Sequence, residues 1–247
     1  MPITDTIGKP TFSKPNSLWR IIDFFYPPFC CHCGKIGFEV CPSCFSKIEI
    51  ISTHRICNSC GRVIQNHGKC PICTLSPPKF DQARSWGIYS GVLKQIIQKI
   101  KYDRGFGVIE YISKPLIDCI FRWGISIDMI IPIPLGKKRE KERGYNQSAL
   151  IAAPISKLLG IPMNKSALSR FRETRSQVGL NYEERNRNIN GAFHAKHTEI
   201  TQKSILLIDD IATTCATLNE SAKTLKLAGA SKVFCFTIAQ TQYSLDK

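Results

Sequence analysis

A chain of 247 residues, of which 43% are hydrophobic, is long enough to bury a full core, and this excludes an intrinsically disordered protein. The formal net charge of +15 favours a polyanionic partner: nucleic acid, phosphorylated metabolites or an acidic membrane surface. The first residues lack the apolar stretch of a signal peptide, and no run reaches the roughly 18 apolar residues of a membrane helix. We therefore expect a soluble cytoplasmic protein without membrane insertion.

The chain divides into three parts on composition. We expect residues 1–26 to form an N-terminal tail and a short amphipathic helix, which Pro27 and Pro28 end. A small cysteine-rich module follows over residues 27–78. The remainder, residues 79–247, has the apolar segments of a larger domain.

Cysteine spacing is the strongest signal in the small module. Eight of the 12 cysteines form four C-x-x-C pairs, and two thiolates on one tight turn can face the same zinc ion at about 2.3 Å. Disulfides need an oxidising compartment, and a redox C-x-x-C occurs singly on a βαβ scaffold. We predict structural zinc that supplies folding energy, in two sites if all eight thiolates bind; the spacing leaves the pairing of the turns open. The predicted ligands are Cys30, Cys33, Cys41, Cys44, Cys57, Cys60, Cys70 and Cys73.

The larger domain shows a pattern of alternating helices and strands. This pattern predicts helices near 90–101, 107–122, 146–159 and 215–228, strands at 128–134, 204–208 and 232–238, and a basic loop over 170–188. The third helix is expected to be interrupted or kinked near Pro154. Strands that alternate with helices predict right-handed crossovers and a parallel sheet that helices cover on both faces.

Two adjacent carboxylates, Asp209 and Asp210, directly follow the strand at 204–208. Ligands of open α/β sheets bind beyond the carboxyl ends of the strands, and the helix N-terminus that follows suits a phosphate. Carboxylates repel phosphate, so the two acids are expected to face hydroxyl groups or a metal ion. A sugar phosphate satisfies both requirements. The alternative is that Asp210 or Thr213 only caps the helix.

The stretch ILLIDDIATTCATL resembles the signature loop of type I phosphoribosyltransferases at every position but one, where Cys215 replaces glycine. With the cysteine-rich module, the chain is similar to the ComF family of competence-associated proteins, which are linked to DNA uptake and DNA use as a nutrient. The blocks that carry this resemblance are YPPFCCHCG, CPSC, CNSCG, IPIPLGKKREKERGYNQSALIA and RETRSQVGLNYEERNRNINGAF. The resemblance implies an α/β fold: a phosphoribosyltransferase-like parallel sheet flanked by helices, with a small zinc-binding module.

The resemblance also implies a binding site for phosphoribosyl pyrophosphate (PRPP) or a nucleotide, with magnesium. The two aspartates would contact the ribose hydroxyls, and the turn after them would hold the 5-phosphate. The implied PRPP-binding residues are Asp209, Asp210, Ala212, Thr213, Thr214, Cys215, Ala216 and Thr217. The implied pyrophosphate and flexible-loop residues are Lys137, Lys138, Arg139, Arg170, Arg172 and Arg175.

Three functions fit these observations. The first is a DNA-uptake or DNA-utilisation factor that binds PRPP or a nucleotide, and single-stranded DNA on its basic surface, with a DNA-uptake helicase or other competence proteins as partners. The second is an active phosphoribosyltransferase of nucleotide salvage, which would release pyrophosphate from C1 of the ribose. The third is a zinc-dependent adaptor with a relic sugar-phosphate site. Glycine would let the backbone approach phosphate, so Cys215 counts against catalysis.

Overall fold

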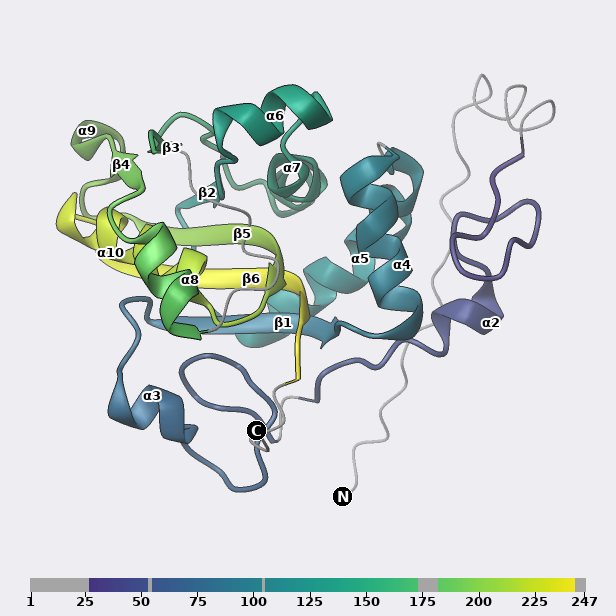
Figure 1. Cartoon of the computed structure of the whole chain (residues 1–247), viewed down its shortest axis with the longest axis horizontal. Helices are drawn as coiled ribbons and strands as arrows, with labels where there is room; N and C mark the ends of the chain where they lie inside the picture. Colours follow the sequence, from purple (N-terminus) through teal and green to yellow (C-terminus); the bar gives the residue numbers. More distant parts are fainter. Residues whose placement is uncertain (1–26, 53–54, 104, 173–181, 243–247) are drawn as a thin grey trace.

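The computed structural model describes residues 27–52, 55–103, 105–172 and 182–242 (Figure 1). Its centre is a sheet of four parallel strands in the order β1-β6-β5-β2. These strands are β1 (Gln82–Ile88), β6 (Lys232–Gln240), β5 (Ser204–Ala212) and β2 (Met129–Pro132). A second sheet pairs β3 (Leu168–Arg170) with β4 (Phe193–Ala195) in antiparallel fashion. The predicted parallel α/β class is confirmed.

Two features define the helices: the spacing of their apolar side chains and the residues at the helix ends. In α4, the buried side chains recur at three- and four-residue intervals from Val92 to Ile100, and α5 ends at Gly124 with a left-handed φ of 68°. The helices are α2 (Pro42–Phe45), α3 (Pro71–Leu75), α4 (Gly91–Tyr102), α5 (Phe106–Trp123), α6 (Lys137–Arg143), α7 (Gln147–Leu159), α8 (Tyr182–Ile189), α9 (His197–Ile200) and α10 (Ala216–Leu227).

The two faces of the sheet bury two separate apolar cores, because successive strand residues point to opposite sides. On one face, Ile205 and Leu207 of β5 pack with α10. On the other face, Leu206 and Ile208 pack with α4, α5 and α7. All four strands are parallel, so their carboxyl ends meet at one edge of the sheet, and the loops at this edge can build a single site.

Several predicted elements differ from the observed ones. Strand β5 continues to Ala212 because residues 209–212 still pair with β6, so the two aspartates lie within the strand rather than after it. Helix α7 runs from Gln147 to Leu159 without interruption at Pro154, and Asn146 and Gly160 cap its ends. The expected loop at 170–188 contains the start of α8. The predicted N-terminal helix lies outside the described residues.

Candidate functional site

The structure resolves the pairing of the four cysteine turns, which the spacing left open. Neighbouring turns pair in sequence, and in each group the four Sγ atoms lie within 4.8 Å of one another. The first zinc unit contains Cys30, Cys33, Cys41 and Cys44; the second zinc unit contains Cys57, Cys60, Cys70 and Cys73.

Sulfur geometry shows that both groups fit zinc. The Cys33 and Cys41 Sγ atoms are 3.6 Å apart, and those of Cys60 and Cys70 are 3.8 Å apart. A tetrahedron with zinc–sulfur bonds of about 2.3 Å has edges of about 3.8 Å, so each cluster has the required size. Backbone N–H groups of Cys41 and Cys70 donate to the Sγ atoms of Cys30 and Cys57, at 3.4 and 3.2 Å. Such bonds orient thiolate ligands.

The two zinc units lie on opposite faces of the sheet (Figure 1). The cysteines of the second zinc unit belong to the core that contains α10, whereas Cys30, Cys41 and Cys44 belong to the core that contains α4 and α5. Backbone bonds dock both units on β1: Ala83 N–H donates to the Ser59 carbonyl, and Ile88 N–H donates to the Glu49 carbonyl. Each unit is therefore part of the packing of one face.

A cavity of about 290 Å³ lies at the carboxyl edge of the sheet. Its walls come from the residue after β1, the segment after β2, the end of β5, and helices α4, α6, α7, α8 and α10. Two carboxylates and five cationic side chains line it: Asp209, Asp210, Lys101, Arg139, Arg143, Arg170 and Arg185. The excess of positive charge suits a ligand with several phosphate groups.

The two aspartates are held by different partners. Asp209 is half-buried, and its Oδ1 accepts hydrogen bonds from Ser148 Oγ at 2.8 Å and from the Asp210 N–H at 2.9 Å. Asp210 is 5% exposed, and its Oδ2 lies 2.8 Å from Lys101 Nζ. Neither aspartate nor Thr213 caps α10, so the capping alternative does not describe this structure.

The electrostatics of the pair follow from this arrangement. Burial, together with the negative charge of Asp210, raises the pKa of Asp209 to about 7. Burial alone would lower the pKa of Lys101, but the Asp210 carboxylate outweighs it and raises that pKa. A magnesium ion or sugar hydroxyls beside Asp209 would favour its charged form. The donor set therefore fits magnesium, which prefers carboxylate oxygens.

The loop between β5 and α10 forms part of the cavity wall. The helix begins at Ala216, where its first N–H groups and the positive end of its dipole suit an anion. Cys215, the residue before the helix, adopts a left-handed φ of 61°. Glycine adopts this conformation readily, whereas a side chain makes it strained, so the predicted conflict at Cys215 is present.

The structure brings most, but not all, of the predicted ligand-binding residues to the cavity. All of the implied PRPP-binding residues line the cavity except Thr214, whose Oγ1 accepts a bond from Ala216 N–H at 3.3 Å behind the loop. Arg139 and Arg170 line the cavity; Lys137, Lys138 and Arg172 are absent from its described lining, and Arg175 lies outside the described residues.

Three cations of the lining were not among the implied site residues: Lys101, Arg143 and Arg185. They come from α4, α6 and α8, which lie far apart in the sequence. The basic run KKREKER indicated that Arg143 belonged to a cationic segment. No local pattern marked Lys101, because it looks like an ordinary surface residue at the end of an amphipathic helix.

Comparisons with known proteins agree with the geometry. A family model described as a double zinc ribbon domain matches residues 21–74. Competence protein F of Haemophilus influenzae is 28% identical over 220 residues, which cover 85% of this chain and 96% of that protein. Competence protein ComFC of Bacillus subtilis is 28% identical over 214 residues, covering 82% of this chain and 85% of that protein.

Among solved structures, the glutamine PRPP amidotransferase of B. subtilis matches with a TM-score of 0.37 and 16% identity, over 56% of this chain and 30% of that one. Among the helices that the structure describes, none is long and apolar enough to cross a membrane. Both relatives match over most of their own length and over most of this chain. Over most of its length, this chain is therefore similar to relatives named competence proteins, and its residues 21–74 match a double zinc ribbon domain.

Proposed function

We propose that this protein acts in DNA uptake or DNA utilisation, and that its cavity binds PRPP or a nucleotide together with magnesium. The role rests on relatives that are named competence and DNA utilization proteins. The ligand rests on one observation: two carboxylates, five cations and a helix N-terminus line the same cavity of about 290 Å³. A metabolite with phosphates at one end and hydroxyl groups in the middle needs this combination.

Each part of such a ligand has a matching group. The 5-phosphate would lie against the N–H groups at the start of α10, beside Thr213 and Thr217. The ribose hydroxyls would face Asp209 and Asp210. The pyrophosphate would lie among the guanidinium groups, which bind phosphate oxygens in a bidentate manner.

Two other functions compete with this proposal. In a salvage phosphoribosyltransferase, the arginines would stabilise the leaving pyrophosphate as its bond to C1 breaks, and bound magnesium would neutralise part of its charge. An entering nucleophile would then form the new bond to C1 on the opposite side. In an adaptor with a relic site, the cavity would bind neither PRPP nor a nucleotide.

Calorimetry distinguishes these hypotheses. We expect PRPP to bind the zinc-loaded protein with magnesium and to bind at least tenfold more weakly without it. The double variant Asp209→Asn/Asp210→Asn should lose the magnesium-dependent binding, whereas Asp118→Asn, an exposed carboxylate on α5, should keep it. Undetectable binding to the wild-type protein would refute the proposed ligand. Formation of pyrophosphate with an added nucleobase would instead favour the salvage enzyme.

Binding of single-stranded DNA is a second function that a specific contact favours. Tyr102 at the end of α4 is 72% exposed, and the Arg143 guanidinium lies 5.5 Å from the centre of its ring. Arg143 also lines the cavity, so an exposed aromatic surface and a phosphate-binding cation adjoin at the cavity mouth. Bases stack on such rings without sequence preference, and cations neutralise the backbone.

A further inference from the structure

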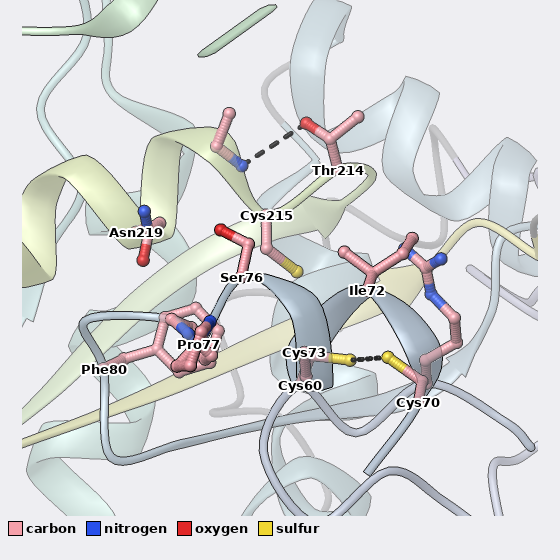
Figure 2. Close-up of a pocket in the computed structure, with 13 residues that line it drawn as sticks. Cys60, Cys70, Ile72, Cys73, Ser76, Pro77, Phe80, Thr214, Cys215 and Asn219 are labelled. Carbon is pink, nitrogen blue, oxygen red and sulfur yellow. Dashed lines mark hydrogen bonds between the residues drawn. The ribbon is translucent and has the colours of Figure 1, made fainter. Parts of the chain in front are cut away.

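Cys215 packs against the second zinc unit from behind the phosphate-binding loop. A small cavity of about 40 Å³ lies between this loop and the zinc unit, and Cys215 lines it together with Cys60, Cys70 and Cys73. Figure 2 shows the Cys215 side chain pointing from the start of α10 toward α3, the helix that carries Cys73. The same residue lines the large cavity on the other side of the loop. Cys215 is thus the partition between the zinc unit and the candidate ligand site.

The backbone conformation of Cys215 shows that surrounding contacts hold it in place. A non-glycine residue with a φ of 61° is strained, and such strain persists only where the surroundings impose it. Cys215 is 9% exposed and belongs to one apolar cluster with the four cysteines of the second zinc unit. The side chain that makes this backbone costly is therefore also the one that attaches the loop to the zinc unit.

Polar bonds attach the same zinc unit and the segment after it to α10 and β6. The backbone N–H of Lys79, just after the zinc unit, donates to Asn219 Oδ1 in the first turn of α10, at 2.6 Å. Gln240 Nε2 at the end of β6 donates to the Cys60 carbonyl at 3.2 Å. The first zinc unit instead contacts the opposite face, where Glu39 pairs with Lys99 of α4 at 2.6 Å.

We propose that the second zinc unit, acting through Cys215, holds the loop at 213–217 in its ligand-binding conformation, whereas the first zinc unit does not. Cys215 is then a positioning residue for the site, and occupancy of one of the two zinc sites controls ligand affinity. This inference rests on the proposed function only for the identity of the ligand. The dependence of the loop on the zinc unit is a separate claim.

Two variants at equivalent positions test the asymmetry. Cys73→Ser and Cys44→Ser each remove the last cysteine of one zinc unit, and both positions lie in the short helix that follows a Cys-Pro pair. Hydrogen exchange of the amides at 213–218 needs no ligand. We expect Cys73→Ser to speed this exchange at least tenfold and Cys44→Ser to change it less than twofold. Equal effects of both variants, or no effect of Cys73→Ser, would overturn the inference.

Cys215→Ala covers the case in which a zinc-ligand variant unfolds. It should keep both zinc ions by elemental analysis but speed exchange of the loop amides at least threefold, because the contact with α3 is lost. Unchanged exchange would contradict the role of Cys215. PRPP titrations of the same samples separate the two proposals. If wild-type protein fails to bind PRPP, only the ligand is wrong; if it binds and Cys73→Ser binds equally well, only the positioning role is wrong.

Discussion

Replacing Asp209 by asparagine should make the protein more stable while removing its ligand binding. The asparagine amide would retain an oxygen to accept the bonds from Ser148 Oγ and the Asp210 N–H, which are 2.8 and 2.9 Å in the parent. The substitution would also remove the repulsion between two adjacent carboxylates. If a substitution in the site makes the protein more stable, the natural side chain costs stability, and we expect it to be retained for binding.

The magnitude follows from the pKa of Asp209, which rises from its usual 3.8 to about 7 in the folded protein. Between these values the folded protein holds a proton that the unfolded chain has released, so the free energy of unfolding falls as the pH rises. At about 1.4 kcal/mol per pH unit, the upper limit of this loss is about 4 kcal/mol. Because Asp209 is only half-buried, we expect about half of that limit, or about 2 kcal/mol.

Urea unfolding of the zinc-loaded protein from pH 5 to pH 8, followed by tryptophan fluorescence without magnesium, measures this effect. Relative to the wild type, Asp209→Asn should gain about 1.4 kcal/mol between pH 5 and pH 8, which is half of the limit for the two pH units from pH 5 to the pKa near 7. Asp118→Asn, an exposed carboxylate on α5, serves as the control and should follow the wild-type curve. Parallel curves for wild type and Asp209→Asn would refute the reasoning about the carboxylate pair.

Three further predictions concern zinc, the ion pair and DNA. Elemental analysis should find about two zinc ions per chain and about one in Cys44→Ser; zinc-free protein from anaerobic purification would contradict both sites. Lys101→Met should lower the free energy of unfolding at pH 8 by about 2 kcal/mol, because Asp210 loses its counter-ion, and unchanged urea curves would exclude this pairing. Reversing Lys137, Lys138 and Arg139 to Glu should weaken single-stranded DNA binding equally for all sequences and flatten its salt dependence; unchanged binding at about 0.1 M salt would remove α6 from the DNA path.

Features that depend on neighbouring residues could be predicted from the sequence. The cysteine pairs, the strand that leads to Asp209 and the small residues at the start of α10 are local patterns, and they indicated a zinc module and a strand-to-helix turn at the edge of the sheet; phosphate binding by that turn stays a prediction. The end of β5 could not be placed, because pairing with β6, rather than the apolar pattern, extends the strand to Ala212. Strand β1 was not predicted, because Arg84 interrupts its apolar pattern. The contact that accommodates Arg84, with its guanidinium 5.4 Å from the centre of the Trp123 ring, is visible only in the folded protein.

Features that depend on the three-dimensional arrangement were out of reach. Lys101 meets Asp210 only because α4 ends at the carboxyl edge of the sheet, and Tyr102 adjoins the cavity only through Arg143. The same applies to Cys215. Its position in the motif predicted a strained backbone, but its contact with the second zinc unit required the packing of two segments that are distant in the sequence.

The most direct test of the central claim is a crystal structure of the zinc-loaded protein with magnesium and PRPP at saturating concentration. The proposed site predicts the 5-phosphate against the loop at 213–217, the ribose beside Asp209 and Asp210, and the pyrophosphate near Arg139 and Arg143. PRPP bound elsewhere on the protein, or no PRPP in the cavity at that concentration, would contradict the claim.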